Sequence, residues 1–207
     1  MNILLFSGGI DSTTLLSFMV RNLHLKVIPI FIDYGQNHAR QERKAVNNIC
    51  KFYNLDYKEI NLPNFLESGL TNNEVPFCHY EDDKMKQIIV PNRNMILISI
   101  AVSIAIQQGC KVAGQKCVYI APHKGDRKIF PDCRKEFIES INEVLKTSET
   151  EVQIKAPFLK YDKRMIAKIA HRINSPIELT WTCYVGEDKP CAKCGACRER
   201  GEALENL

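Results

Sequence analysis

Residues 7–12 read Ser-Gly-Gly-Ile-Asp-Ser, a combination that could bind the phosphates of a nucleotide. The two adjacent glycines let the backbone turn sharply and bring its N–H groups against an anion, and Ser7 and Ser12 add hydroxyl donors. Asp11 offers a carboxylate for a metal ion or a water beside the phosphates. The loop matches neither the P-loop nor the dinucleotide fingerprint and contains no lysine. It therefore fits an enzyme that grips the departing pyrophosphate while the α-phosphate of ATP is attacked; the alternative is an ordinary turn before a helix.

A second group with chemical potential is formed by Cys183, Cys191, Cys194 and Cys197. Two Cys-x-x-Cys steps share Cys194, and four thiolates suit a closed, structural zinc site without an open position for catalysis. An iron–sulfur cluster is the alternative. The other five cysteines are expected to be structural: Cys50, Cys78, Cys110, Cys117 and Cys133. Of these, Cys133 is expected to be a small buried residue rather than a nucleophile.

The elements around the loop predict how it is held. An apolar strand over 2–6 precedes it and a helix over 13–19 follows it, which places the glycines at a helix N-terminus that favours anions. Further strands are predicted over 26–32, 57–61, 117–121 and 152–156, and further helices over 39–53, 94–108, 132–146 (with Asp132 as N-cap) and 162–172. This alternation predicts an α/β fold with a doubly wound parallel sheet, whose ligands bind at the carboxyl ends of the strands. Residues 63–90 are expected to form a long surface loop, in the manner of a lid.

The composition limits the function classes. A chain of 207 residues suits one α/β domain over 1–175 with a small metal-binding segment over 176–207. The net charge of +4 is too mild and too scattered to indicate nucleic-acid binding. The longest apolar run, residues 95–106, is too short to span a bilayer. With no visible signal peptide and nine cysteines, we expect a cytoplasmic protein with reduced or metal-bound thiols.

Several motifs together resemble one family. Besides the first loop, they are Asp33-Tyr34-Gly35-Gln36, Pro91-x-Arg93-Asn94, Phe130-Pro131-Asp132-Cys133-Arg134, and Glu178 to Tyr184 followed by the cysteine triplet. In this order, over nearly the whole chain, they resemble the 7-cyano-7-deazaguanine synthases (QueC) of the PP-loop ATP pyrophosphatase superfamily. The resemblance implies an adenine nucleotide alpha hydrolase-like fold. It also implies conversion of 7-carboxy-7-deazaguanine, with ATP and ammonia, into the nitrile through an adenylated carboxylate and an amide, in queuosine biosynthesis. Magnesium would neutralise the phosphates.

The resemblance also implies residue roles. Pyrophosphate would be held by Ser7, Gly8, Gly9, Asp11 and Ser12, and the nucleotide site would be lined by Tyr34, Gly35 and Gln36. Arg93 is a catalytic candidate for the substrate carboxylate or the α-phosphate, because its fork suits both. The carboxylate that binds the guanine-like edge stays open among Asp126, Asp132 and Glu178. Arg134 and Trp181 complete the substrate candidates, and Trp181 either stacks on the heterocycle or packs in the core. Among the histidines, His123 is expected near the site. The others are expected on the surface or in the core: His24, His38, His79 and His171.

One segment departs from the family pattern and keeps other functions open. Residues 121–127 read Ala-Pro-His-Lys-Gly-Asp-Arg, in which Asp126 keeps its register while its neighbours differ. One alternative is a QueC-like paralogue of an anti-phage defence system that adenylates and transfers a deazaguanine-type group to a protein partner, or binds that partner. Others are a transfer-RNA modifying PP-loop enzyme such as a thiolase, and a non-catalytic ATP-binding module. The family resemblance also suggests a homodimer.

Overall fold

The computed structural model describes residues 2–63, 66–80, 82–108, 116–148, 150–205 and 207, so Cys110 lies outside the described residues. Its centre is a parallel sheet of five strands in the order β3-β2-β1-β4-β5. The strands are β1 (Asn2–Leu5), β2 (Val27–Asp33), β3 (Lys58–Asn61), β4 (Lys116–Tyr119) and β5 (Val152–Lys155). The strand order turns back at β1, which confirms the doubly wound parallel sheet and places a crevice between β1 and β4.

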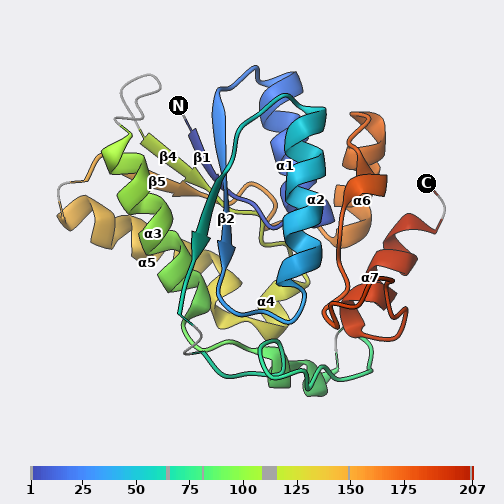
Figure 1. Cartoon of the computed structure of the whole chain (residues 1–207). Coiled ribbons are helices and arrows are strands. Elements are labelled where there is room, and N and C mark those ends of the chain that lie inside the picture. The colour runs from blue at the N-terminus through green and yellow to red at the C-terminus, as the bar shows by residue number, and fades with distance from the viewer. Residues whose placement is uncertain (1, 64–65, 81, 109–115, 149, 206) are drawn as a thin grey trace.

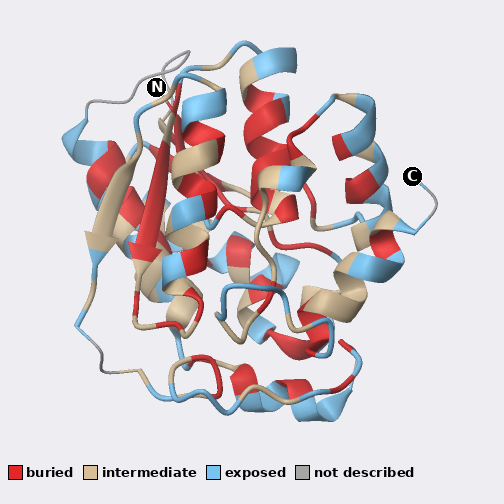
Figure 2. Cartoon of the chain, turned by 45° about the vertical axis from the view of Figure 1, so that its right-hand side comes forward, coloured by how far each residue is buried: buried red, intermediate tan, exposed pale blue. Residues whose placement is uncertain are grey.

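Helices cover both faces of the sheet (Figure 1). One face carries α1 (Ile10–Ser17, continued by a π-helical turn over Phe18–Asn22), α2 (Ala39–Phe52) and α6 (Lys163–Arg172). The other face carries α3 (Arg93–Gln107) and α5 (Lys135–Thr147). Successive side chains of β1 point to opposite faces of the sheet, since Ile3 packs with α3 and α5 while Leu4 packs with α1 and α2. Figure 2 shows the resulting pattern, with buried inner and exposed outer helix surfaces.

The structure corrects the predicted start of one helix. Helix α5 begins at Lys135 with Arg134 as N-cap, so the prediction that Asp132 caps it is wrong. Asp132 lies in a 3-10 turn over Pro131–Cys133, where proline favours a tight turn before the helix proper. Its carboxylate accepts a hydrogen bond from the backbone N–H of Asn94 (3.3 Å) and thereby caps the first turn of α3.

The segment over 63–90 was expected to be a surface loop, and its described residues fit that expectation only in part, because Asn72, Asn73 and Glu74 are exposed whereas several apolar side chains are buried. Leu70, Tyr80 and Met85 are buried, together with Ile88 of a 3-10 helix over Asp83–Ile88. They form a cluster with residues that follow the sheet strands. Because these apolar side chains leave water, the segment is a packed layer across the carboxyl ends of the strands, below the sheet in Figure 1.

Two helices were not predicted, namely α4 (Asp126–Ile129) and α7 (Gly195–Leu204). Helix α7 packs against α6. The chain before α7 crosses the first loop, where the backbone N–H of Trp181 donates to the carbonyl of Gly8 (3.0 Å). The predicted domain boundary at residue 175 stays a prediction. No helix within the described ranges is long and apolar enough to cross a membrane.

Candidate active site

A cavity of about 260 Å³ opens at the carboxyl edge of the sheet. It brings together residues from four separate parts of the chain: the first loop, the loop after β2, the start of α3 and the segment after β4. Of the predicted site residues, those that line it are Ser7, Gly9, Asp11, Ser12, Tyr34, Gln36, Arg93 and Asp126. Tyr80 and Tyr184 close it from the packed layer and from the C-terminal segment.

The first loop has the geometry of an anion site. Gly8 has φ +72°, and a Cβ there would lie 2.9 Å from the Cβ of Ala45, so only glycine fits. Helix α1 starts at Ile10, earlier than predicted, and its N-cap Gly9 provides no side-chain cap. The first-turn N–H groups therefore remain available to a ligand, and the helix dipole favours an anion there. Ser12 donates its hydroxyl to the carbonyl of Gly9 (3.2 Å) and lies 3.4 Å from the Ser7 hydroxyl.

A lysine that sequence reasoning missed reaches this loop from the start of α6. The Lys163 ammonium donates to Oδ2 of Asp11 and lies 3.4 Å from a carboxylate oxygen of Glu199 in α7. Burial alone would lower the pKa of Lys163, but the Asp11 and Glu199 carboxylates outweigh it and raise the pKa, so the lysine stays charged. Its position was open to prediction, because it follows β5 and a capping Asp162 at the carboxyl edge of the sheet.

Asp11 keeps one oxygen for a ligand. Oδ2 is bound by Lys163, whereas Oδ1 is buried and has no hydrogen-bond partner within the described part of the chain. A buried carboxylate oxygen is costly without a partner, and a divalent cation or its bound water would provide one. The loop therefore fits a magnesium ion that accompanies the phosphates of ATP.

The unusual segment over 121–127 forms a hydrogen-bonded turn beside the loop. Asp126 accepts from the Tyr80 hydroxyl (2.7 Å) through Oδ1 and from the backbone N–H of His123 (2.8 Å) through Oδ2. The buried His123 ring accepts from the N–H of Gly125 (3.0 Å) through Nδ1, so its proton lies on Nε2. That nitrogen faces Asp126 (3.4 Å) and Glu199 (3.6 Å), which confirms the expectation that His123 lies near the site.

Arg93 projects a cation into the same cavity. Its guanidinium lies over the rings of Tyr34 (5.9 Å) and Phe130 (5.8 Å), and its Nε donates to Asn94 (3.2 Å). Burial, as the largest cause, raises the pKa of Tyr34, so its hydroxyl stays protonated beside this cation. Both rings lie within cation–π distance of the guanidinium, whose planar fork is suited to a carboxylate or a phosphate.

Sequence reasoning also missed a carboxylate in the cavity wall, Glu42 in the first turn of α2. Gln36 donates to its Oε2 (2.8 Å), while Gln36 itself accepts from the N–H of Tyr34 (2.9 Å). Nε2 of His38 lies 3.6 Å from Oε1 of Glu42. Burial raises the pKa of Glu42 above its usual range, although His38 and Gln36 oppose the shift. The signal in the sequence was the i,i+4 spacing of His38 and Glu42 directly after the Asp-Tyr-Gly-Gln motif.

The other predicted site residues lie outside the cavity lining, and their roles stay predictions. Glu178 and Arg134 are exposed, and Arg134 donates to the carbonyl of Arg127 (3.2 Å). Gly35 turns the chain at φ +90°, and its N–H donates to Asp33 (3.0 Å). Trp181 is half-buried, with its indole N–H donating to the carbonyl of Cys183 (2.8 Å). Besides these, Gly8 and Asp132 occupy the positions described above.

The remaining cysteine and histidine predictions are also placed. Cys133 is buried in the cavity wall, where burial raises the pKa of its thiol, so it is protonated at neutral pH. This agrees with a small buried residue and disfavours a thiolate nucleophile. Burial likewise raises the pKa of Cys50 to about 12. Cys78 and Cys117 are buried as well; His38 is in the core, and His24, His79 and His171 are exposed.

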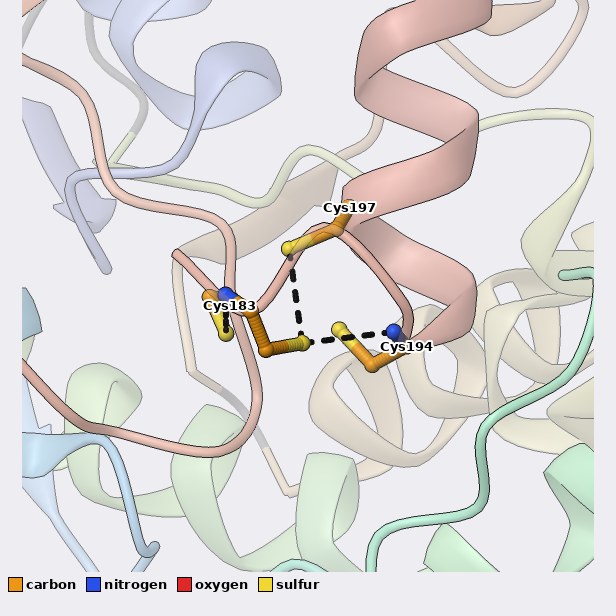
Figure 3. Close-up of side chains that lie close together, drawn as sticks. Cys183, Cys194 and Cys197 are labelled. Atoms are coloured by element: carbon orange, nitrogen blue, oxygen red, sulfur yellow. Dashed lines mark hydrogen bonds between the residues drawn. The ribbon is translucent and has the colours of Figure 1, made fainter. Parts of the chain in front are cut away.

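The four C-terminal cysteines converge as predicted, and Figure 3 shows Cys183, Cys194 and Cys197 of this cluster. Their sulfur atoms all lie within 4.8 Å of one another, and those of Cys191 and Cys197 are 4.0 Å apart. A tetrahedral ion with metal–sulfur bonds of about 2.3 Å would hold its sulfurs about 3.8 Å apart, whereas a cluster of irons would separate them further. Hydrogen bonds from Cys194 and Cys197 are the main cause that lowers the pKa of Cys183, which favours a thiolate. The geometry therefore suits one tetrahedral metal ion.

The cysteine cluster also positions a residue of the active site. Cys194 is the N-cap of α7 and Cys197 lies in its first turn, so a bound metal fixes where this helix begins. Two residues further, Glu199 faces Lys163 and His123. Arg200 anchors the same turn by donating to the hydroxyls of Thr180 (2.6 Å) and Thr182 (3.0 Å). The C-terminal segment is thus connected to the phosphate loop through buried charges.

Comparisons with known proteins identify a family for this chain. The family model described as queuosine biosynthesis protein QueC matches residues 1–207. Relatives named 7-cyano-7-deazaguanine synthase include one from Marinomonas sp., 41% identical over 98% of this chain and 92% of its own length. Another, from Caldicellulosiruptor saccharolyticus, is 37% identical over 99% of this chain and 91% of its own length. Among solved structures, the U34-tRNA thiolase NcsA from Methanococcus maripaludis, described with its [4Fe-4S] cluster, has a TM-score of 0.56 at 16% identity. This chain covers 63% of the thiolase with 98% of its own residues, and the likeness shows the fold alone.

Proposed function

The chain belongs to the QueC family of queuosine biosynthesis proteins, and we propose that it acts as an ATP-dependent 7-cyano-7-deazaguanine synthase. In this proposal the carboxylate of 7-carboxy-7-deazaguanine attacks the α-phosphate of ATP, and pyrophosphate leaves. Ammonia then attacks the acyl adenylate, AMP leaves, and the amide forms. The amide oxygen attacks a second ATP, pyrophosphate leaves, and loss of AMP and two protons from nitrogen gives the nitrile.

One observation supports this chemistry most directly. The uncapped start of α1, the Lys163–Asp11 pair and the Arg93 guanidinium lie at the carboxyl edge of the sheet, where Asp11 and Arg93 line one cavity. The first two suit a leaving pyrophosphate, because N–H groups and an ammonium stabilise its growing charge. Arg93 suits the acid that attacks. Magnesium, when bound with ATP beside the free oxygen of Asp11, would neutralise phosphate charge.

We expect turnover to release AMP and pyrophosphate, with oxygen transfer from the acid to AMP. If the acid carries ¹⁸O in its carboxylate, each activation should place one labelled oxygen in the phosphate of AMP, because the C–O bond breaks when nitrogen displaces the adenylate. Mass spectrometry of AMP and of the nitrile tests this. ADP and phosphate as direct products, or unlabelled AMP alongside nitrile, would contradict the proposed route.

For the metal site, we propose one structural zinc ion per chain. Replacing the buried Cys194 with serine should abolish stoichiometric zinc and loosen α7, because the helix loses its capping ligand. ATP should still bind, since the phosphate loop lies on α1. Elemental analysis and hydrogen exchange on residues 195–204 are the measurements, and Cys50→Ser is the matched control, since Cys50 lies outside the cluster. Iron in anaerobically purified protein would contradict the assignment.

The remaining proposals concern the setting of the protein. Its partners are proposed to be small molecules, namely 7-carboxy-7-deazaguanine and ammonia, without nucleic acid. We place the protein in the cytoplasm, where its cysteines stay reduced, and propose a homodimer. Light scattering measures the oligomeric state, and a gel shift with transfer RNA over a range of salt concentrations checks the absence of nucleic-acid binding.

A further inference from the structure

Among the residues that the structure describes, three carboxylates line the cavity, and they differ in what they can still bind. Asp126 has both oxygens engaged, by the Tyr80 hydroxyl and the His123 N–H. Asp11 faces Lys163 and belongs to the phosphate loop. Glu42 has one oxygen engaged by Gln36, while its second oxygen has only the His38 ring at 3.6 Å. Glu42 is therefore the cavity carboxylate with the most accepting capacity left for a ligand outside the phosphate loop.

A second acceptor lies beside it. The His38 ring is 4% exposed, lines the same cavity and packs against Tyr184 at 5.4 Å. Its Nδ1 is buried and has no hydrogen-bond partner among the residues that the structure describes. With the ring proton on Nε2, toward Glu42, Nδ1 is a free acceptor. Buried acceptors without partners are costly, so this wall is complementary to a ligand with several N–H donors.

From this wall we infer that Glu42, held by Gln36 and His38, is the specificity-determining residue that binds the adjacent ring and amino N–H donors of the base. This inference rests on the proposed function and names the residue that recognises its substrate. A guanine-type base presents two parallel donors on that edge, whereas adenine presents one donor beside an acceptor. A carboxylate offers two acceptors and so favours the guanine-type edge.

The charges of the cavity fit the same orientation. The acid has a donor edge at one end and a carboxylate on the five-membered ring. The same cavity is lined by an anionic side chain, Glu42, and by a cationic one, Arg93. If Glu42 binds the donor edge, the substrate carboxylate is left for Arg93. The reverse orientation would bring the substrate carboxylate against Glu42, which has the same charge.

The test compares Glu42→Gln with Asp126→Asn and with the exposed control Glu205→Gln. Glutamine keeps the size of Glu42 and an oxygen for Gln36, so the fold should persist, which circular dichroism checks. We expect Glu42→Gln to raise KM for the acid about 10–100-fold, with KM for ATP unchanged. KM for the isolated amide intermediate should rise equally, because the amide has the same base edge.

An analogue that lacks the 2-amino group gives the second measurement. The unmodified protein should prefer the true acid, Glu42→Gln should lose most of this preference, and Asp126→Asn should retain it. Binding of the acid or its analogue, in mixtures without ATP in which no reaction occurs, can be followed by the fluorescence of Trp181, the one tryptophan of the chain. If the preference is lost in Asp126→Asn instead, or if only KM for ATP rises in Glu42→Gln, the inference is wrong. If the unmodified protein forms no nitrile, the proposed function fails, whereas nitrile formation with an unaffected Glu42→Gln variant overturns only this inference.

Discussion

Replacing Lys163 with methionine should lower the rate of pyrophosphate release by about 10²–10³-fold, the usual cost of removing one preorganised donor from a developing anion. The ammonium donates to Asp11 of the phosphate loop, and the Lys163 side chain is only 11% exposed, so water replaces it poorly. ATP–pyrophosphate exchange in the presence of the acid measures the step directly. Lys168→Met is the matched control, because Lys168 lies on the same helix and is exposed.

The same substitution should destabilise the fold. It leaves Asp11 and Glu199 buried without their shared cation, and breaking a buried pair costs about 3–5 kcal/mol. The double variant Lys163→Met/Asp11→Asn removes one of the two stranded charges and should recover part of the stability but none of the rate. Urea unfolding and exchange rates on the three variants separate the two effects. A Lys163→Met variant with normal exchange would show that the lysine is only structural.

Local patterns in the sequence were enough to predict the sheet and the phosphate loop. Alternating apolar runs and helical spacing predict β1 to β5 together with α1, α2, α3, α5 and α6, and the glycines at 8 and 9 predict the loop that starts α1. The four cysteines predict their own convergence, because metal-ligand spacing is a short-range signal. In each case the sequence signal lies in the same short stretch of chain that forms the predicted structure.

Tertiary contacts decided what the sequence could not predict. Local signals point to Lys163 and Glu42, but only the fold pairs Lys163 with Asp11 and Glu199 and brings Glu42 to the cavity wall. Residues 63–90 have no regular period, so their burial depends on the partners Tyr34 and Phe130. Asp132 precedes a predicted helix, yet it caps α3 because a proline turn moves the start of α5 to Lys135. A single sequence shows local propensity, whereas these outcomes follow from packing between distant segments.

Replacing Arg93 with methionine should lower kcat/KM for the acid by about 10²–10³-fold, as expected when one partner of a buried charge pair is removed. The guanidinium lies within cation–π distance of the Tyr34 and Phe130 rings, and its Nε donates to Asn94, so its fork is preorganised for an oxyanion. Arg93→Lys should recover only part of the loss, because an ammonium neither stacks nor binds two oxygens in one plane. Arg172→Met, at an exposed position, controls for charge alone.

Comparing the rates of the two half-reactions shows which oxyanion Arg93 binds, the substrate carboxylate or the α-phosphate. If it binds the substrate carboxylate, Arg93→Met should slow conversion of acid to amide far more than conversion of amide to nitrile, because the amide is neutral at that position. If it binds the α-phosphate, both half-reactions should slow alike, since each consumes an ATP in the same site. Arg93 lines the same cavity as Glu42, and binding of the base edge by Glu42 would leave the substrate carboxylate for Arg93, which favours the first outcome. Single-turnover rates from acid and from amide, measured on the same variant, decide between them.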